Sequence, residues 1–543
     1  MKKKYFKNLQ TIINKIPTKW QRGIKVFLLL LLFTFTVIIP DYLLRIFKDT
    51  YIAGFHTHTF LYIFWFMSSL FLIKSNKFFI TVLSLVWLLM LSSMFYLFHF
   101  GRYFLDVDIP MLFVETKDIS IGFFADMIRF WYLPIMCIII FTLSILLRKK
   151  TYKIVPHSNK FIAVFLLIFL YQPYTTIGKS ADRYAPHPLR YMLRNGLKSV
   201  SSCLVKAVSS HSEEKSFLPY KVVKEKEISE PTTVILYMLE GVSANNMSLY
   251  GYERNTTPRL NTFKNDDNFV FKDSMSIAVS TLTSLSMFFN FQKEAENYKV
   301  IFNKDANLFK MAKEQGFQTL MYSPQENKTF ANIGMEYIDK FVYRNEAKKQ
   351  YKQKGDKYGL ELLKTTKLKD KNFIVVQTRA THYPYEHAYE HSPQFNIFND
   401  KTKDFRVNTY DNAVRYIDDL LADALEYTKT LKGKMYFIIT SDHGQLLGQD
   451  GLYGHTFLHK EVVKIPFILY TKNIDKKDIT TINQKKIVTH YDISKFLAKV
   501  FGFDVINPNT PEDTYFINGS GVDGKRGFMK YKIENNKLIW LKD

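Results

Sequence analysis

The sequence predicts a five-span α-helical membrane domain followed by an α/β domain with a mainly parallel central sheet. Five apolar segments crowd the first third of the 543-residue chain. From Thr232 onward, strand-like and helix-like segments alternate, which is the pattern of helices packed on a mainly parallel sheet. A chain of this length is expected to hold two or three domains. We therefore predict a membrane domain over residues 1–177, an interfacial helix and linker over 178–231, and a soluble domain over 232–543.

The five apolar segments have the length of membrane-spanning helices. Each holds about 16–21 residues, near the span of a ~30 Å hydrocarbon core, and the shortest ones need tilt or interfacial ends. The segments are Val26–Leu44, Phe55–Ile73, Phe78–Phe98, Trp131–Leu147 and Phe161–Thr176.

Charge in the loops predicts the orientation of these segments. Residues 1–25 are rich in lysine, and no signal-peptide cleavage site follows them. The loops 74–77 and 148–160 also carry basic residues, whereas residues 101–129 mix several carboxylates with few bases. Under the positive-inside rule, the basic loops face the cytoplasm. An odd number of spans then places everything after Thr176 outside the cytoplasm.

Bulk composition limits the partners and the kind of metal site. The net charge of +24 and the pI near 9.5 favour an anionic partner. Because the chain is 47% hydrophobic and 16% aromatic, we expect a membrane with anionic lipids and not nucleic acid. The two cysteines, Cys137 and Cys203, lie in an apolar run and a basic linker, so no disulfide framework is expected. Any zinc must therefore be held by His, Asp, Glu or a hydroxyl.

The segment between the two domains predicts a surface-lying helix. Leu189–Val208 places leucines, methionine and valine on one face and arginines and lysines elsewhere, which is typical of a helix in the membrane interface. A core helix of the soluble domain is the alternative. Ser209–Pro231, rich in Ser, Glu and Lys, is predicted to be an exposed linker.

Possible metal ligands follow two predicted buried strands. The apolar run Met435–Ile439 is followed by Asp442 and His443, and the run Thr233–Leu239 ends on Glu240. In open α/β sheets, ligands bind just beyond the carboxyl ends of the strands. Carboxylate oxygens and imidazole nitrogens are good zinc ligands. The sequence therefore predicts a metal site at this edge of the sheet.

His455 follows in the run Gly-Leu-Tyr-Gly-His and is close enough in sequence to fold back over the same edge. Each of these residues also has a plainer interpretation when it is taken alone. Asp442 could cap a helix, His443 could lie on the surface, and Glu240 could be solvated in a loop.

Three longer motifs make the interpretation more specific. They are LEGVSANNMSLYGYERNTTP at 239–258, SDHG at 441–444 and GLYGH at 451–455. Together they resemble the phosphoethanolamine transferases of bacterial lipopolysaccharide, membrane-anchored members of the alkaline-phosphatase/sulfatase superfamily. The resemblance extends over the whole chain, because five spans, an interfacial helix and a periplasmic α/β domain form that family's architecture. The wording is most similar to the branch that acts on core heptose.

The resemblance implies a threonine nucleophile at the start of a helix. Thr281, Ser284, Leu285 and Phe289 fit the family pattern Thr-x-x-Ser-(hydrophobic)-x-x-x-Phe. A shift by one residue would make Ser280 the nucleophile. A hydroxyl at a helix N-terminus lies among unpaired N–H groups that favour negative charge, and zinc coordination would lower its pKa. Without the family pattern, the segment would be interpreted as a Ser/Thr-rich helix cap.

The resemblance also implies roles for the remaining site residues. His382 follows the predicted strand Phe373–Gln377, and the family has a histidine here that contacts the phosphoryl group or a second metal. His382 and His455 would stabilise the phosphoryl oxygens and handle protons. One zinc ion would be tightly bound, and the scheme allows a second. The implied zinc ligands are Glu240, Thr281, Asp442 and His443.

The chain departs from the family at several positions. Glu240 is followed by Gly-Val-Ser where the family has Thr-x-Arg, and Gln445 stands where the family has Glu. The cysteines that form periplasmic disulfides in the lipid A-modifying branch are absent. These departures weigh against lipid A as the acceptor and leave the expected metal ligands in place.

The resemblance implies transfer of phosphoethanolamine from phosphatidylethanolamine to a lipopolysaccharide-type glycolipid through a phospho-threonine intermediate. The expected location is the bacterial inner membrane, with the catalytic domain in the periplasm. A phosphoglycerol transferase using phosphatidylglycerol is the alternative. A formylglycine sulfatase is disfavoured because its Cys/Ser-x-Pro-x-Arg signature is absent. A transporter would explain the spans but not Glu240, Asp442 and His443.

Overall fold

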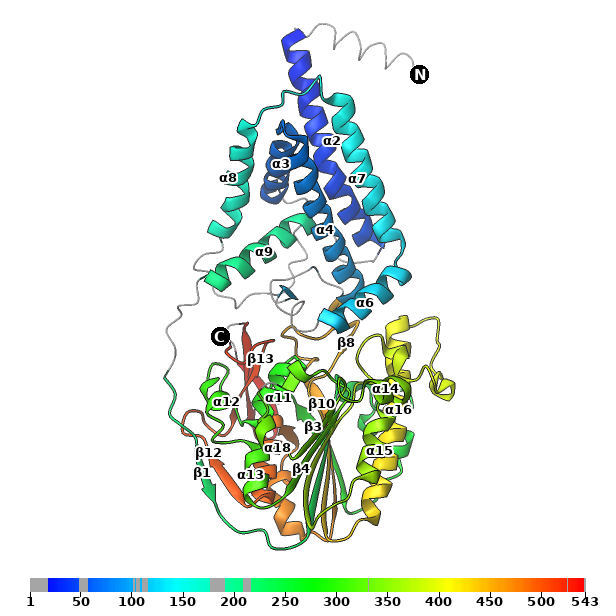
Figure 1. The fold of residues 1–543 in the computed structure, drawn as a ribbon, viewed down its shortest axis with the longest axis vertical. Helices are drawn as coiled ribbons and strands as arrows, with labels where there is room; N and C mark the ends of the chain where they lie inside the picture. Colours follow the sequence, from blue (N-terminus) through cyan, green and yellow to red (C-terminus); the bar gives the residue numbers. More distant parts are fainter. Residues whose placement is uncertain are drawn as a thin grey trace. The chain divides into compact units, whose positions relative to one another are not determined.

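The computed structural model of the chain describes residues 18–47, 57–100, 103, 108–109, 116–175, 191–208, 216–330, 332–524 and 526–541 (Figure 1). The chain divides into two compact units, Met1–Ser212 and Glu213–Asp543. In the described residues the first unit is helical, and the second combines helices with sheets.

The first unit contains helices at all five predicted apolar segments. Among the described residues, α2, α4 and α7 are long and apolar enough to cross a membrane, whereas α3 and α8 are shorter apolar helices. The predicted ends at Phe55 and Thr176 lie outside the described residues. Large apolar side chains such as Leu88 and Leu167 are more than half exposed, as expected for lipid-facing positions. The helices of this unit are α2 Thr18–Phe47, α3 Thr57–Leu72, α4 Asn76–Phe100, α6 Thr116–Arg129, α7 Tyr132–Thr151, α8 Lys160–Tyr174 and α9 Met192–Val208.

The amphipathic helix α9 belongs to the helical unit and not to the core of the soluble domain. Its apolar residues Met192, Leu193 and Leu197 are buried among the membrane helices. The backbone N–H of Met192 donates to Asp41 Oδ2 at 2.8 Å, so a carboxylate of α2 satisfies the start of α9.

The predicted exposed linker is partly a strand. Its stretch β1, Lys221–Lys224, pairs antiparallel with β12, Phe503–Ile506. The two inner valines of Lys-Val-Val-Lys are half-buried and the outer lysines are exposed. Because valine favours strands, this short apolar pair forms a strand inside an otherwise polar segment.

The described residues of the second unit form an eight-stranded mixed sheet in the order β11-β3-β10-β7-β2-β6-β4-β5. Strand β10 runs antiparallel to both of its neighbours, and every other pairing is parallel. The strands are β2 Thr232–Leu239, β3 Phe269–Met275, β4 Gln318–Ser323, β5 Lys340–Tyr343, β6 Lys371–Gln377, β7 Lys434–Ser441, β10 Lys464–Lys472 and β11 Ile487–Thr489.

Helices cover both faces of this sheet (Figure 1). Successive side chains of β2 point to opposite faces, so Leu236 and Met238 enter one apolar core while Ile235 and Tyr237 enter the other. The first core lies under α11 Thr281–Phe289, α13 Leu308–Glu314 and α18 His490–Val500; the second lies under α15 Lys357–Thr365 and α16 Phe405–Thr430.

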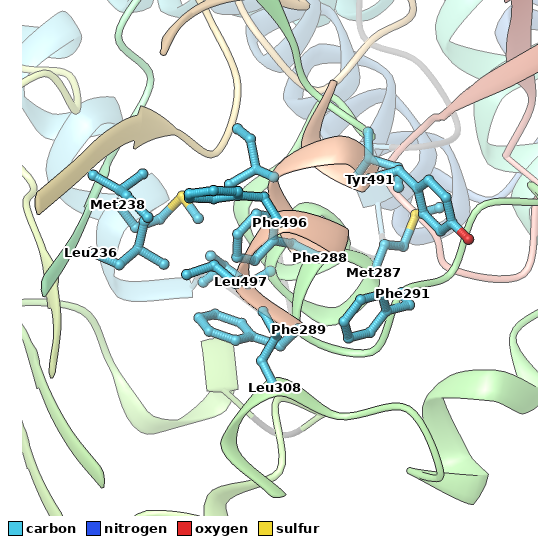
Figure 2. Packing of buried hydrophobic residues seen from close by; sticks show 14 of the residues in the cluster. Leu236, Met238, Met287, Phe288, Phe289, Phe291, Leu308, Tyr491, Phe496 and Leu497 are labelled. Carbon is cyan, nitrogen blue, oxygen red and sulfur yellow. The ribbon is translucent and has the colours of Figure 1, made fainter. Parts of the chain in front are cut away.

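Helix α11 is anchored by a dense aromatic cluster (Figure 2). Its residues Phe288 and Phe289 are fully buried and pack with Phe496 and Leu497 of α18. Burial of each phenylalanine contributes about 1.5–3 kcal/mol to stability. The N-terminus of α11, which carries Thr281, is therefore held firmly against the sheet.

Shorter elements complete the second unit. A three-stranded antiparallel sheet follows the central sheet in sequence, and a two-stranded hairpin, β8–β9, lies between β7 and β10. These elements are β8 Leu446–Leu447, β9 Tyr453–Gly454, β13 Thr514–Asn518, β14 Phe528–Glu534, β15 Lys537–Leu541, α10 Pro258–Asn261, α12 Lys299–Asn303, α14 Lys348–Lys354 and α17 Thr480–Asn483.

Candidate metal centre

The two predicted carboxylates meet because β2 and β7 are parallel neighbours. Leu239 pairs with Ser441 at the carboxyl ends of the two strands, so the next residues, Glu240 and Asp442, emerge at the same edge. The backbone N–H of Gly241 donates to Asp442 Oδ1 at 2.9 Å. Both carboxylates are buried.

Thr281 lies against these carboxylates as the first residue of α11. Its Oγ1 is 3.1 Å from each carboxylate oxygen of Glu240 and 3.4 Å from Nε2 of His443. The alternative hydroxyl, Ser280, precedes the helix and donates instead to Oγ1 of Thr283 at 3.1 Å. The structure thus places Thr281, and not Ser280, in hydrogen-bond contact with Glu240.

The imidazole of His443 is oriented with its Nε2 toward the carboxylates. Its Nδ1 is 2.9 Å from the carbonyl oxygen of Gly444, so this nitrogen carries the proton and donates. The Nε2 atom lies 3.5 Å from Glu240 Oε1 and 3.5 Å from Asp442 Oδ2. With Nδ1 donating to this carbonyl, the Nε2 atom would present a lone pair to a metal once it is deprotonated.

His455 completes the cluster by stacking on His443. The two ring centroids are 4.0 Å apart, with 20° between the ring planes. Ligand atoms of Glu240, His443 and His455 all lie within 4.8 Å of one another. The hairpin β8–β9 returns His455 to the edge where His443 stands, as its position in sequence predicts.

The donor set fits a metal ion. Asp442 Oδ2 and His455 Nδ1 are buried and have no hydrogen-bond partner among the residues that the structure describes. Buried polar atoms are rarely left in this state unless an ion or water completes the site. Carboxylate, imidazole and hydroxyl donors in one dry cluster are the ligands that zinc accepts.

The pKa shifts within the cluster also fit a functional site. Burial and the neighbouring charge of Glu240 raise the pKa of Asp442 to about 7. Burial disfavours a charge on His443, but Asp442 and Glu240 outweigh it and raise the pKa of this imidazole to about 9. Burial and His443 together lower the pKa of His455 well below its ordinary value. Groups forced together with such opposing shifts are typical of functional sites.

A family comparison agrees with this geometry. A family model described as "Sulfatase" matches residues 232–503, half of the chain. The chain belongs to the sulfatase family.

The sulfatase-family domain has curated relatives that transfer phosphoethanolamine. "Phosphoethanolamine transferase EptC" of Escherichia coli K12 is 27% identical over 274 residues, which cover 47% of this chain and 45% of the relative. "Kdo(2)-lipid A phosphoethanolamine 7''-transferase" of the same organism is 26% identical over 233 residues, covering 40% of each chain. The chain thus spans about half the length of the curated relatives it matches.

One solved structure shares the fold of both units. It is the "integral membrane protein lipooligosaccharide phosphoethanolamine transferase A (EptA) from Neisseria meningitidis", with a TM-score of 0.57 and 16% identity. The match covers 88% of this chain and 94% of that protein. A helical membrane region followed by a sulfatase-family domain is therefore the fold of this chain.

His382 lies outside the three-residue cluster, on the loop that follows β6. Its Nδ1 is 2.8 Å from the carbonyl oxygen of Tyr383 and 3.2 Å from Nη2 of Arg379. Arg379 Nη1 donates to Gln325 Oε1 at 2.6 Å, and Gln325 Nε2 donates to Glu240 Oε2 at 2.5 Å. A chain of hydrogen bonds therefore links His382 to the metal cluster of the sulfatase-family domain.

Gln325 and Arg379 are site residues that the sequence interpretation missed. Both follow the carboxyl ends of parallel strands, β4 for Gln325 and β6 for Arg379. The same signal that identified Glu240 and Asp442 could have found them, because all four strands end at one edge of the sheet.

Helix α16 fixes the loop behind Glu240. The hydroxyl of Tyr410 donates to the carbonyl oxygen of Gly241 at 2.7 Å and accepts from the N–H of Ser243 at 2.8 Å. Gly241 has φ +63°, a conformation that favours glycine, so the sharp turn after Glu240 depends on this residue.

Gln445, the family departure next to the cluster, forms a hydrogen bond with Tyr385. Its Nε2 donates to the hydroxyl of Tyr385 at 2.5 Å, and both side chains are buried. The substitution therefore changes the packing beside the site and leaves Glu240, Asp442 and His443 together.

Proposed function

We propose that this chain is a zinc-dependent transferase that moves phosphoethanolamine from phosphatidylethanolamine to a lipopolysaccharide-type glycolipid. The observation that carries the proposal is the contact of the Thr281 hydroxyl with both oxygens of Glu240 inside a buried donor set. The names of the relatives EptC and Kdo(2)-lipid A phosphoethanolamine 7''-transferase support the reaction class. The proposed location is the bacterial inner membrane, with residues 1–177 as a five-span anchor, 178–231 as the interfacial segment and 232–543 as the periplasmic domain.

Zinc would be held by Glu240, Thr281, Asp442 and His443. His382 and His455 offer imidazoles for a second ion. When bound, zinc lowers the pKa of a coordinated hydroxyl and offsets negative charge on phosphoryl oxygens. The buried, unsatisfied Oδ2 of Asp442 supports this assignment.

In the first step, the Thr281 oxygen attacks the phosphorus of phosphatidylethanolamine. The bond between phosphorus and the diacylglycerol oxygen breaks as the new P–O bond forms, and diacylglycerol leaves after taking a proton. The hydroxyl of Thr281 already donates to Glu240, so a carboxylate stands where its proton departs. His382 and His455 stabilise the phosphoryl oxygens and pass the proton released by Thr281 to the leaving group.

In the second step, a hydroxyl or phosphate oxygen of the acceptor attacks the same phosphorus. The phosphorus–Thr281 bond breaks, and the threonine hydroxyl is restored. The same histidines pass the proton released by the acceptor back to the oxygen of Thr281. Anchoring the domain to a membrane keeps it at the surface where the lipid donor is concentrated, a proximity effect.

A headgroup assay separates this proposal from phosphoglycerol transfer. The full chain would be placed in vesicles with lipopolysaccharide and either ethanolamine-labelled phosphatidylethanolamine or glycerol-labelled phosphatidylglycerol. We expect label to move from phosphatidylethanolamine only, and Thr281→Ala to abolish the movement. Transfer from phosphatidylglycerol at an equal or greater rate would contradict the proposed donor.

A further inference from the structure

A hollow of about 390 Å³ opens in the second unit, built from segments that also carry the metal ligands. Its volume lies within the range of sites that bind small molecules, roughly 300–1,000 Å³. The lining residues are Asn245, Asn246, Tyr252, Lys403, Asp404, Val407, Leu447, Gln449 and Tyr453.

Two walls of the hollow are continuous with the metal centre. Asn245 and Asn246 belong to the loop that follows Glu240. Leu447 and Tyr453 pair across the hairpin β8–β9, which begins shortly after His443 and ends immediately before His455. Because two residues span at most ~7 Å of extended chain, the backbone of Tyr453 lies beside that of His455.

The aromatic walls are held in fixed positions. The hydroxyl of Tyr453 donates to Asp404 Oδ2 at 3.2 Å, and the guanidinium carbon of Arg406 lies 3.2 Å from the centre of its ring. Rigid walls lower the entropic cost of binding a ligand.

Asp411 of α16 holds the opposite wall. The hydroxyl of Tyr252 donates to its Oδ2 at 2.8 Å, and the side-chain amide of Asn246 donates to its Oδ1 at 3.0 Å. Asp411 is fully buried, so this anchor for Tyr252 and Asn246 belongs to the folded core and not to the surface.

The lining chemistry is that of a saccharide site. Tyrosine rings pack against the C–H faces of a pyranose, while the amides of Asn245 and Gln449 and the charged groups of Lys403 and Asp404 suit hydroxyls and acidic substituents. The apolar lining is limited to Val407 and Leu447, which is too little to enclose an acyl chain.

We propose that this hollow binds a sugar ring of the acceptor glycolipid, next to the ring whose oxygen receives the phosphoethanolamine group. The inference rests on the proposed function and adds a position for the acceptor. Its location beside His455 lets one sugar be held while a neighbouring one reaches the phosphorus on Thr281.

Binding of a soluble saccharide tests the site without turnover. The probe is the core oligosaccharide released from lipopolysaccharide by mild acid, titrated into the full chain in detergent and followed by calorimetry. We expect saturable binding that Tyr252→Leu weakens by about 10-fold, because the ring that stacks on the sugar is lost. Tyr252→Phe keeps the ring and should recover most of the affinity.

Matched lysine variants control for charge and folding. Lys403→Ala removes a lining group and should weaken binding, whereas Lys401→Ala removes an exposed lysine of the same loop that does not line the hollow. Absence of saturable binding by the parent, or equal losses in both lysine variants, would overturn the proposal.

A second readout separates this inference from the proposed function. The phosphoethanolamine adduct on the peptide 274–293 is measured with phosphatidylethanolamine alone. For Tyr252→Leu we expect kcat/KM for lipopolysaccharide to fall about 10-fold relative to adduct formation. If Tyr252→Leu lowered kcat/KM for lipopolysaccharide and the rate of adduct formation by the same factor, the hollow would not be an acceptor site. If the parent chain bound the saccharide but formed no adduct, the proposed transfer reaction would be contradicted, whereas the proposed sugar site would still be supported.

Discussion

At the residue scale, the candidate centre is a set of ionisable groups that would be costly to bury without a cation. Glu240 and Asp442 are both carboxylates, and the second cannot ionise easily beside the first, as the raised pKa of Asp442 shows. Within the protein, the positive charge that mainly offsets these two carboxylates is that of the His443 imidazole, whose Nε2 lies 3.5 Å from an oxygen of each. A divalent ion would balance the two carboxylates and let both remain charged.

Metal content gives the first residue-scale prediction. Asp442→Ala and His443→Ala should each lower bound zinc from about one ion per chain to a small fraction, because each removes a ligand from a site of about four. Zinc would be measured by elemental mass spectrometry after gel filtration. His459→Ala, which removes the partner of the exposed Asp450 and lies outside the proposed ligand set, should keep full zinc. Full occupancy in both ligand variants would mean that the ligands are assigned wrongly.

Arg379 gives the second residue-scale prediction. Its guanidinium contacts both Gln325 and His382, so it fixes two side chains beside the phosphoryl position and adds positive charge there. We expect Arg379→Ala to lower the rate of adduct formation by about 10²-fold, the scale of a lost oxyanion donor, and zinc content to stay unchanged.

Arg379→Lys should recover little of this loss, because a single ammonium cannot reproduce the two contacts of the guanidinium fork. The rate would be measured by quenched-flow mass spectrometry of the 274–293 peptide. An adduct rate equal to the parent's in Arg379→Ala would remove this residue from the mechanism.

Part of the site could be predicted from sequence because parallel strands end at one edge. Glu240 and Asp442 each follow an apolar run, and the structure brings them together with Thr281 and His443. The same strand-end signal places Gln325 and Arg379 at this edge, but their contacts depend on side-chain hydrogen bonds, from Arg379 to Gln325 and from Gln325 to Glu240, which no spacing along the sequence reveals.

At the element scale, α16 contacts the segment between β2 and α10 at several points. One of these contacts is made by Asp418, a carboxyl group whose pKa is raised. Asp418 of α16 accepts hydrogen bonds from the N–H groups of Arg259 and Leu260, at 2.8 and 2.9 Å, and so caps the start of α10. Burial raises the pKa of this carboxyl to about 6. The folded chain therefore holds this proton more tightly than the unfolded chain does.

The pH dependence of stability follows from that shift. The contribution of Asp418 is fully present below its ordinary pKa, near 4, and is lost as the pH rises through about 6. Between these values, the free energy of unfolding of the parent should fall relative to that of Asp418→Asn. Denaturant titrations of the full chain in detergent at several pH values would measure this difference.

Asp419→Asn provides the matched control, because Asp419 is a partly exposed neighbour paired with Arg259. It should show the same pH dependence as the parent. If Asp418→Asn also kept the parent's slope between about pH 4 and pH 6, Asp418 would not be the titrating group.

The alternation of strands and helices predicted the parallel part of the sheet but not β10. Parallel neighbours need a crossover, usually a helix. Between β7 and β10, residues 442–463 instead carry His443, the hairpin β8–β9 and His455, so the chain returns antiparallel. The departure from a parallel sheet thus coincides with the segment that carries His443 and His455.

At the scale of the whole molecule, the chain joins a helical membrane unit to a sulfatase-family domain. The continuous apolar runs predicted the helical unit well, because helices that cross a membrane must be apolar along their length. The number of spans stays a prediction, since α3 and α8 are shorter than the other apolar helices among the described residues. Helices of this length span the hydrocarbon core only where the bilayer thins or the helix ends lie in the interface.

In the proposed mechanism, Thr281 carries the phosphoethanolamine group between donor and acceptor. The most direct test is the mass of the peptide 274–293 after the full chain is incubated with phosphatidylethanolamine and no acceptor. We predict one added phosphoethanolamine on Thr281, absent from Thr281→Ala and retained in Ser280→Ala. An adduct on Ser280 would move the nucleophile by one residue. Transfer to lipopolysaccharide without an adduct on any hydroxyl of this peptide would contradict the covalent mechanism.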